Sequence, residues 1–260
     1  MKKIALITGA SSGIGKELAR IHAEKGGDLV IVARSAGKLN QLKEELESKT
    51  SAKVTVIVKD LSLPNASQEV YQEVKKAGIE VDYLINNAGF GGQGKFHERA
   101  WEEDLAMINL NVVALTALTR LFLPDFVKRN SGKILNVSST ASLLPGPLQA
   151  VYYATKAYVT SFSNAIDEEL YDTNISVTAL LPGATETEFA KVSGMDKTDL
   201  FNNTFSAREV AQAGYDGMIE GKLNVMAGLT FAQRLMMRSI PFTPKKMLLS
   251  QIRKMQEVPA

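Results

Sequence analysis

The sequence of 260 residues contains no cysteine. A chain without thiols cannot form disulfides, bind metals through thiolates or use a cysteine nucleophile. This absence agrees with a reducing compartment, and we expect a cytoplasmic protein. The only histidines, His22 and His97, lie too far apart in sequence for the spacing of metal ligands. We therefore expect no metal site and interpret both histidines as surface or boundary residues.

A strong excess of charge and long apolar runs are also missing. The chain has 30 Lys and Arg residues against 28 Asp and Glu, a formal net charge of +2, so bulk electrostatics gives no reason to expect nucleic acid. No apolar stretch approaches the length needed to cross a bilayer. The apolar residues that follow Met1 are interrupted at Thr8 and Gly9, too early for a signal peptide. We expect neither a secretory signal nor a membrane partner.

The composition is that of a globular protein, with 45% hydrophobic and 22% charged residues. A chain of this length lies within the range of one α/β domain and can bury a large core. Because no internal repeat or low-complexity linker is present, we predict a single domain over residues 1–260.

A glycine-rich segment near the start lies between a predicted buried strand, residues 3–8, and a predicted helix, residues 16–25. Its glycines follow the pattern Gly-x-x-x-Gly-x-Gly, which permits a tight turn and a close approach of phosphate. The free N–H groups at the start of a helix attract a pyrophosphate. An ordinary glycine-rich turn is the alternative. We predict that the segment binds a dinucleotide through Gly9, Ser11, Ser12, Gly13, Ile14 and Gly15.

The second predicted strand, residues 28–33, is followed by Arg34. In a dinucleotide-binding fold an acidic residue at this place bonds the ribose 2′-hydroxyl, whereas an arginine suits a 2′-phosphate. Arg34, with Lys38 as a second cation, therefore predicts NADP(H) rather than NAD(H), although a solvated arginine is also possible. Asp60 ends the third strand, where it can accept a hydrogen bond from the adenine amino group or cap the next helix.

Tyr152 and Lys156 stand four residues apart in a predicted helix over residues 152–171, so their side chains share one face. A nearby ammonium lowers the pKa of a tyrosine from its ordinary value of about 10. Such a pair can exchange a proton with an alcohol or a ketone near neutral pH. The spacing alone is a weak signal, because it occurs by chance in many proteins.

Taken in order along the chain, the motifs resemble those of the short-chain dehydrogenase/reductase family. The resemblance covers nearly the whole chain and implies one Rossmann-type, doubly wound α/β domain with a seven-stranded parallel sheet and helices on both faces. It also implies an oxidoreductase that interconverts a carbonyl and an alcohol with NAD(P). The matching segments are residues 8–15, Asp60-Leu61, residues 86–89, Ser139, Tyr152 with Lys156, and Pro182-Gly183.

The resemblance assigns roles to individual residues. Tyr152 is implied to be the general acid in reduction and the base in oxidation, while Lys156 lowers its pKa and reaches the nicotinamide ribose. Ser139 orients the carbonyl, with Ser138 as the alternative. Asn111, with Asn109 as the alternative, supports a proton relay through water. Further contacts with the cofactor are expected from Leu61, Asn87, Ala88, Gly89, Pro182, Gly183, Thr185 and Thr187.

The second half of the chain is less informative about substrate. The apolar loop of residues 140–148 lines a substrate pocket or packs locally, and residues 190–205 are predicted to form a substrate lid. The C-terminal extension, residues 229–260, is interpreted as a helix pair docked on the domain, as a pocket wall or as a membrane-surface segment.

A loose resemblance to hydroxysteroid dehydrogenases and 3-ketoacyl-CoA reductases suggests a hydrophobic carbonyl substrate, and the family implies a homodimer or homotetramer. We predict a carbonyl reductase. A catalytically idle NADP(H)-binding sensor or scaffold is the alternative.

Overall fold

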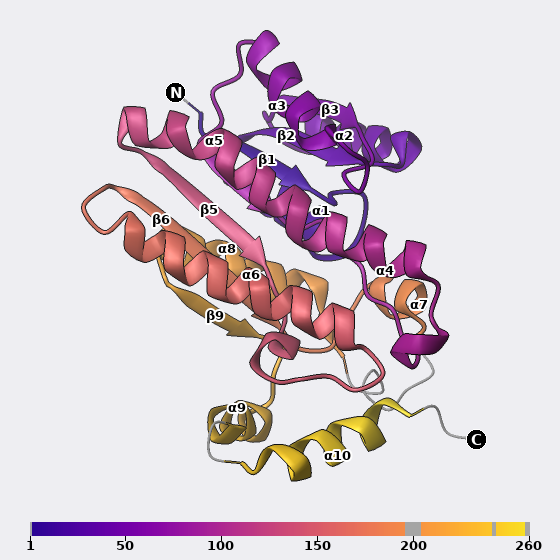
Figure 1. The fold of residues 1–260 in the computed structure, drawn as a ribbon. Coiled ribbons are helices and arrows are strands. Elements are labelled where there is room, and N and C mark those ends of the chain that lie inside the picture. The colour runs from indigo at the N-terminus through magenta and orange to yellow at the C-terminus, as the bar shows by residue number, and fades with distance from the viewer. Residues whose placement is uncertain (1, 196–203, 241–242, 258–260) are drawn as a thin grey trace.

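A single seven-stranded parallel sheet forms the centre of the computed structural model, which describes residues 2–195, 204–240 and 243–257 (Figure 1). The strand order is β3-β2-β1-β4-β5-β6-β9. The sequence predicts this sheet correctly. The strands are β1 (Ile4–Thr8), β2 (Asp28–Ala33), β3 (Val54–Val58), β4 (Tyr83–Asn86), β5 (Gly132–Val137), β6 (Ile175–Pro182) and β9 (Asn224–Ala227).

Helices cover both faces of the sheet, which explains why its central strands are almost continuously apolar. Along β1, Leu6 faces one apolar cluster and Ile7 faces the other. The Ile7 side of the sheet carries α1 (Gly13–Glu24), α2 (Ala36–Lys49) and α8 (Ala207–Glu220). The Leu6 side carries α3 (Ala66–Lys76), α5 (Leu115–Arg129) and α6 (Ala150–Glu169).

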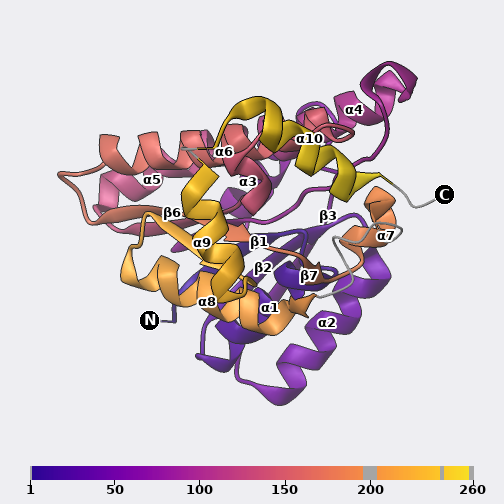
Figure 2. The same ribbon diagram turned by 90° about the horizontal axis from the view of Figure 1, so that it is seen from below.

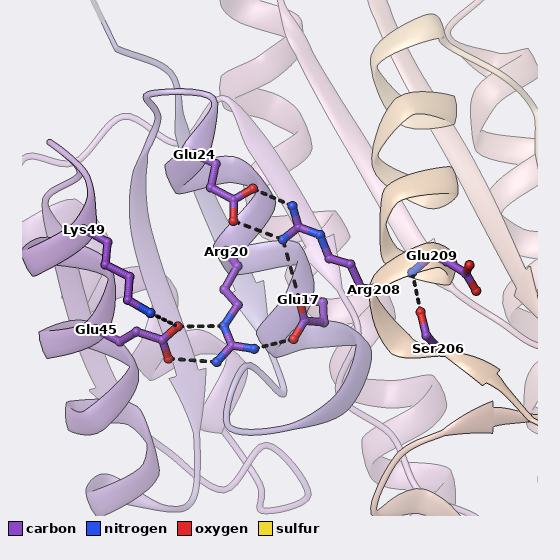
Figure 3. A network of polar contacts seen from close by, with 8 residues as sticks. All are labelled: Glu17, Arg20, Glu24, Glu45, Lys49, Ser206, Arg208 and Glu209. Atoms are coloured by element: carbon purple, nitrogen blue, oxygen red, sulfur yellow. Dashed lines mark hydrogen bonds and ion pairs between the residues drawn. The ribbon is translucent and has the colours of Figure 1, made fainter.

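Charged side chains join the helices on the first face (Figure 3). Arg20 of α1 bonds Glu45 of α2 at 2.8 Å, and Arg208 of α8 forms an ion pair with Glu24 of α1. Pairs at this level of exposure contribute little stability each, about 0–1 kcal/mol. Their effect is to fix how α2 and α8 sit on either side of α1, the helix that follows the glycine-rich loop.

The order of the strands reverses next to β1, because β2 and β3 lie on one side and β4 to β9 on the other. Ile7 of β1 pairs in register with Ile31 of β2 and with Ile85 of β4. The loops that leave β1 and β4 must therefore diverge to opposite faces at the same edge of the sheet. Open α/β sheets bind ligands in the crevice that such a reversal creates.

One helical run corrects an expectation from sequence. α4 (Trp101–Ile108), the π-helical turn η2 (Asn109–Ala114) and α5 together are long and apolar enough, by length and composition, to cross a membrane. The prediction that no such stretch exists is therefore wrong. The run is apolar because its inner face packs against the sheet, where Leu118, Phe122 and Phe126 are buried.

His22 is buried rather than at the surface, and this prediction is also wrong. Its Nε2 lies 3.0 Å from the carbonyl oxygen of Lys3, and its Nδ1 lies 2.9 Å from the hydroxyl of Tyr215. Gly27 makes the room, since a Cβ there would lie 2.1 Å from His22 Nε2. Burial lowers the pKa of His22, so the ring is neutral and bridges α1, α8 and the start of β1. His97 is exposed, as predicted.

The C-terminal extension forms two helices, α9 (Phe231–Ser239) and α10 (Lys245–Gln256), along the lower edge of the molecule in Figure 1. A capping box starts α9, in which Thr230 and Gln233 exchange hydrogen bonds. At the start of α8, Ser206 likewise accepts a hydrogen bond from the backbone amide of Glu209. The remaining short elements are η1 (Phe96–Glu98), η3 (Thr140–Leu143), α7 (Phe189–Ser193), β7 (Thr185–Glu186) and β8 (Phe205–Ser206).

Candidate active site

A cavity of about 460 Å³ lies at the carboxyl edge of the sheet. Loops that follow β1 to β6 contribute to it, together with the first turns of α6. It brings together every predicted site residue except Gly15 and Asn111. Those that line it are Gly9, Ser11, Ser12, Gly13, Ile14, Arg34, Lys38, Asp60, Leu61, Asn87, Ala88, Gly89, Ser139, Tyr152, Lys156, Pro182, Gly183, Thr185 and Thr187.

The glycine-rich loop requires its glycines for two different reasons. Gly9 and Gly13 have φ angles of +66° and +53°, a left-handed conformation that strains other residues. A Cβ at Gly13 would also lie 2.9 Å from Thr187 Cγ2, across the cavity mouth. Gly15 lies behind the loop, where a Cβ would meet the Gly9 carbonyl oxygen at 2.4 Å. Gly15 therefore permits close packing of α1 and does not line the cavity.

Asn87 and Thr8 lock the loops after β1 and β4 together. The Asn87 side-chain amide donates to the carbonyl oxygen of Thr8 at 2.9 Å, and the Thr8 hydroxyl accepts from the backbone amides of Asn87 and Ala88. The Asn87 amide group is therefore engaged with the glycine-rich loop. Its position fixes the two walls of the crevice against each other.

Each cation predicted to bind a 2′-phosphate has a carboxylate partner. Arg34 Nη1 lies 3.7 Å from Asp60, and Lys38 Nζ lies 2.7 Å from Glu188. The hydrogen bond from Lys38 holds the pKa of Glu188 below its usual range. The sequence argument missed Glu188, which lies far along the chain and reaches Lys38 only because the loop after β6 folds over the cavity.

The cavity fits a phosphorylated dinucleotide on structural grounds. Its glycine-rich loop leads into α1 through Gly13, which has no side chain, and the backbone N–H groups at the start of a helix attract a pyrophosphate. Arg34 and Lys38 stand at the end of β2, beside the position of the adenosine ribose in this type of fold. Tyr152 and Lys156 line the opposite end of the same cavity.

Tyr152 is buried in the cavity wall, which Ser139 also lines. Burial raises the pKa of Tyr152 to about 12, and the nearby Ser139 hydroxyl offsets this rise only in part. The predicted lowering of this pKa by Lys156 is not found. The reason is geometric, because Lys156 Nζ lies 5.9 Å from the centre of the Tyr152 ring and donates elsewhere.

Lys156 is also buried, and its Nζ donates to the carbonyl oxygen of Val137 at 2.9 Å. Burial lowers the pKa of Lys156 from 10.5 to about 8. The ammonium therefore releases its proton much more readily than an exposed lysine. A Cβ on Gly89 would lie 3.4 Å from this nitrogen and only 2.9 Å from Asn111 Oδ1, so a glycine lets the loop after β4 pass close to both side chains.

The two serines that end β5 have different surroundings. Ser138 is buried, and its hydroxyl donates to the carbonyl oxygen of Lys156 at 2.9 Å and contacts the hydroxyl of Thr160 at 2.7 Å. Ser139 starts η3 by accepting from the amide of Ala141 and also reaches Tyr152. The geometry favours Ser139 as the residue that faces a substrate, and Ser138 anchors α6 to β5.

Asn111 lies in the π-helical turn η2, where regular helical hydrogen bonding is interrupted. Its side-chain amide donates to the carbonyl oxygen of Phe90 at 2.9 Å and to the hydroxyl of Thr155 at 3.1 Å, and its oxygen accepts from the amide of Phe90. It lies directly behind Gly89. Asn109 is half-buried and has no such set of contacts, so the geometry favours Asn111.

Apolar side chains form the part of the cavity next to Tyr152. They include Phe90, Leu110, Phe189 and Met195, of which Phe189 stacks at a tilt on the Tyr152 ring with centroids 5.4 Å apart. Residues 142–148 do not line the cavity, and Leu144 instead packs against the aromatic cluster, which favours local packing of this loop. Most of the predicted lid, residues 196–203, lies outside the described residues.

Tyr153 is a cavity residue that the sequence argument missed. It lines the cavity beside Tyr152, and its hydroxyl accepts a hydrogen bond of 2.6 Å from the side-chain amide of Gln256. Gln256 is buried at the end of α10, and its carbonyl oxygen accepts from Gln93. The C-terminal extension is thus hydrogen-bonded to the wall of the site. The two bonded residues are 103 positions apart in sequence, so no local pattern predicts the contact.

The fold and the site define a dinucleotide-binding α/β domain with a buried tyrosine, serine and lysine at one end of the cavity. Residues 3–198 match the family model described as short chain dehydrogenase. The chain belongs to this family and is an oxidoreductase of the short-chain dehydrogenase type.

The chain is similar in sequence or structure to the following three proteins. The very-long-chain 3-oxoacyl-CoA reductase of Mus musculus is 36% identical over 196 residues, which cover 72% of this chain and 61% of the relative. The NADP-dependent 3-hydroxy acid dehydrogenase of Schizosaccharomyces pombe is 37% identical over 195 residues, covering 73% and 74%. A short-chain dehydrogenase from Sphingobium yanoikuyae in complex with NADPH has a TM-score of 0.83 and 32% identity, with 98% of both chains covered.

The match spans less than two thirds of the length of the mouse relative. The predicted family, the class of enzyme and NADP(H) as cofactor are confirmed. The roles of individual site residues, the cytoplasmic location and the homo-oligomeric state stay predictions.

Proposed function

We propose that the chain reduces a hydrophobic ketone or aldehyde to the alcohol with NADPH, and catalyses the reverse oxidation with NADP⁺. The observation that carries the proposal is that Tyr152, Ser139 and Lys156 line the same cavity as the glycine-rich loop. The apolar side chains around Tyr152 and the names of the mouse and yeast relatives support a 3-oxoacyl thioester or a related hydrophobic carbonyl.

The cofactor would be held by the glycine-rich loop, by Arg34 and Lys38 at its adenosine end, and by Lys156 at its nicotinamide end. When bound, it supplies the hydride for the carbonyl carbon. The protein supplies position and the proton. Tyr152 Oη, which its raised pKa keeps protonated, donates to the carbonyl oxygen, and the Ser139 hydroxyl donates a second hydrogen bond that stabilises the developing charge.

Lys156 supplies a nearby labile proton, because its pKa of about 8 lies close to neutrality. Within the part of the chain that the structure describes, the ammonium donates to the carbonyl oxygen of Val137 alone, so its other N–H groups can turn toward the cavity. Asn111 holds the loop at Phe90 and Gly89 next to this ammonium. In this arrangement Asn111 positions the loop of Gly89 and Phe90, beside which a proton relay would run.

The test is the Tyr152→Phe variant, assayed by NADPH consumption over aldehydes, diketones, steroids and 3-ketoacyl thioesters. Turnover should fall by at least about a hundredfold, because the proton donor is removed. NADPH affinity, measured by fluorescence titration, should change little. The matched control is Tyr158→Phe on the same helix, which removes a partly exposed hydroxyl that contacts Thr116.

Full activity in the Tyr152→Phe variant would show that another group donates the proton. Tight NADPH binding by the unmodified protein without turnover of any substrate in the panel would instead favour the sensor or scaffold.

A further inference from the structure

The charge of the chain is unevenly divided between its body and its C-terminal extension. Seven of the 30 basic residues but only one of the 28 acidic residues fall after residue 220, which leaves 23 basic and 27 acidic residues in positions 1–220. The small net charge of +2 is thus the sum of an acidic part, residues 1–220, and a basic C-terminal part, residues 221–260. The basic residues are Lys222, Arg234, Arg238, Lys245, Lys246, Arg253 and Lys254.

Helix α9 exposes large apolar side chains. Phe231 is 84% exposed, Leu235 61% and Met236 49%. Every side chain from Phe231 to Met236 is exposed, and Met237 is half-buried. A helix this short is marginal in water without packing. The capping box at Thr230 specifies α9 locally, but Phe231, Leu235 and Met236 stay largely exposed.

Helix α10 continues this surface, with one buried side and one exposed side. Ile252 and Gln256 point inward and are buried, which docks the helix on the domain. Met247, 52% exposed, and Lys254 are seven residues apart and therefore lie in one row on the opposite side. Lys245 and Lys246 at the start of the helix are exposed as well.

The exposed cations of the two helices are available for a partner. Lys222 pairs with Glu220, and Arg253 pairs with Glu257. Within the part of the chain that the structure describes, the remaining cations make no ion pair. These are Arg234, Lys245, Lys246 and Lys254.

Both helices lie along one edge of the molecule. They form its lower margin in Figure 1 and face the viewer in Figure 2, which is seen from that side. Exposed apolar side chains beside unpaired cations are the combination that binds the interface of an anionic bilayer, where apolar groups enter the headgroup region and cations meet lipid phosphates. We propose that α9 and α10 form a docking surface for an anionic lipid bilayer.

A second copy of the chain fits this surface less well. A two-fold contact would place the same basic patch against itself, and its cations would repel each other without carboxylates to pair with. An anionic bilayer neutralises every cation of the patch at once. The surface also adjoins the site, because Gln256 of α10 bonds Tyr153 in the cavity wall. This inference does not depend on the identity of the reaction.

The experiment is co-sedimentation of the full chain with vesicles of phosphatidylcholine alone and with vesicles of equal parts phosphatidylcholine and phosphatidylglycerol. The protein should bind the anionic vesicles and lose binding at high salt. Lys245→Gln with Lys246→Gln should weaken binding by about twenty-five-fold, at about fivefold per cation. Phe231→Ser with Leu235→Ser should weaken it by at least about tenfold, since the inserted apolar area is lost.

Matched controls come from the other surfaces of the protein. Lys76→Gln with Lys128→Gln removes two exposed lysines from α3 and α5, and Tyr171→Ser removes an exposed aromatic ring after α6. These controls should bind like the unmodified protein, and all variants should retain NADPH binding, which verifies their fold. Activity is not the readout, so a failed reductase assay leaves this test intact.

The proposal is overturned by an absence of binding to anionic vesicles. It is equally overturned if the control variants weaken binding as much as the α9 and α10 variants. A dimer detected by light scattering that Phe231→Ser with Leu235→Ser dissociates would identify the surface as a subunit interface instead.

Discussion

Replacing Lys156 with methionine is expected to stabilise the ligand-free protein while it abolishes turnover. Burial lowers the pKa of Lys156 from 10.5 to about 8. Each pH unit between these values corresponds to about 1.4 kcal/mol, so the charged lysine costs the folded state roughly 3 kcal/mol. The hydrogen bond to Val137 returns about 1 kcal/mol and is lost in the variant. The expected net gain is about 2 kcal/mol at neutral pH.

The gain depends on pH in a defined direction. Below about pH 8 the lysine is charged in both the folded and the unfolded states, so the folded state bears the whole cost of burying the charge. Above pH 10.5 it is neutral in both states and the cost vanishes. The stability advantage of the methionine variant should therefore be full at neutral pH and decline between pH 8 and 10.5.

The assay is thermal unfolding followed by circular dichroism at neutral pH and at pH 10.5. For a chain of this size the gain corresponds to a rise in Tm of about 4–8 °C at neutral pH. Lys76→Met, at an exposed lysine, should change Tm little at either pH. A Lys156→Met variant that is less stable than the unmodified protein at neutral pH, or equally stabilised at both pH values, would refute the reasoning.

The remaining predictions concern the cofactor. Arg34→Asp should shift the ratio of NADPH to NADH affinity toward NADH by about tenfold or more, since a charge-assisted bond is replaced by repulsion; an unchanged ratio in fluorescence titration excludes Arg34. Glu188→Gln should tighten NADPH binding up to about fivefold with little effect on NADH binding. The reason is that the exposed Glu188 carboxylate no longer competes with the 2′-phosphate for Lys38. Equal effects on the binding of both cofactors would contradict this. Gly13→Val should abolish binding of both, given its left-handed φ and the nearness of Thr187, whereas Gly37→Val in the exposed first turn of α2 should bind both normally.

The elements that local pattern determines were predictable. Apolar runs identify the strands, and the glycine-rich loop between β1 and α1 identifies the reversal of the sheet at β1. Ser139 could be preferred over Ser138 only in part, because the choice depends on which hydroxyl α6 engages. The structure resolves it through the bonds of Ser138 with Lys156 and Thr160.

Contacts between distant segments were not predictable from one sequence. Glu188 meets Lys38 across 150 positions, and Gln256 meets Tyr153 across 103. His22 looked like a surface residue because its partners, the Lys3 carbonyl and Tyr215, lie on separate elements. The prediction of a lowered pKa for Tyr152 was wrong for a related reason. Spacing predicts that Lys156 shares its face, but the direction of the ammonium and the extent of burial depend on the packed site.

The shifted pKa values of Tyr152 and Lys156 have one physical cause, burial, which raises the first pKa and lowers the second. Burial disfavours the charged form of each group, so it keeps the phenol protonated and makes the ammonium a readier proton donor. In the function proposed above, a site arranged in this way would give a proton to a carbonyl oxygen and replace it from the lysine. In the proposed reaction these are the protonation states with which the reduction of a carbonyl begins. The cost is the buried charge of Lys156, which the folded chain retains although a methionine would be more stable.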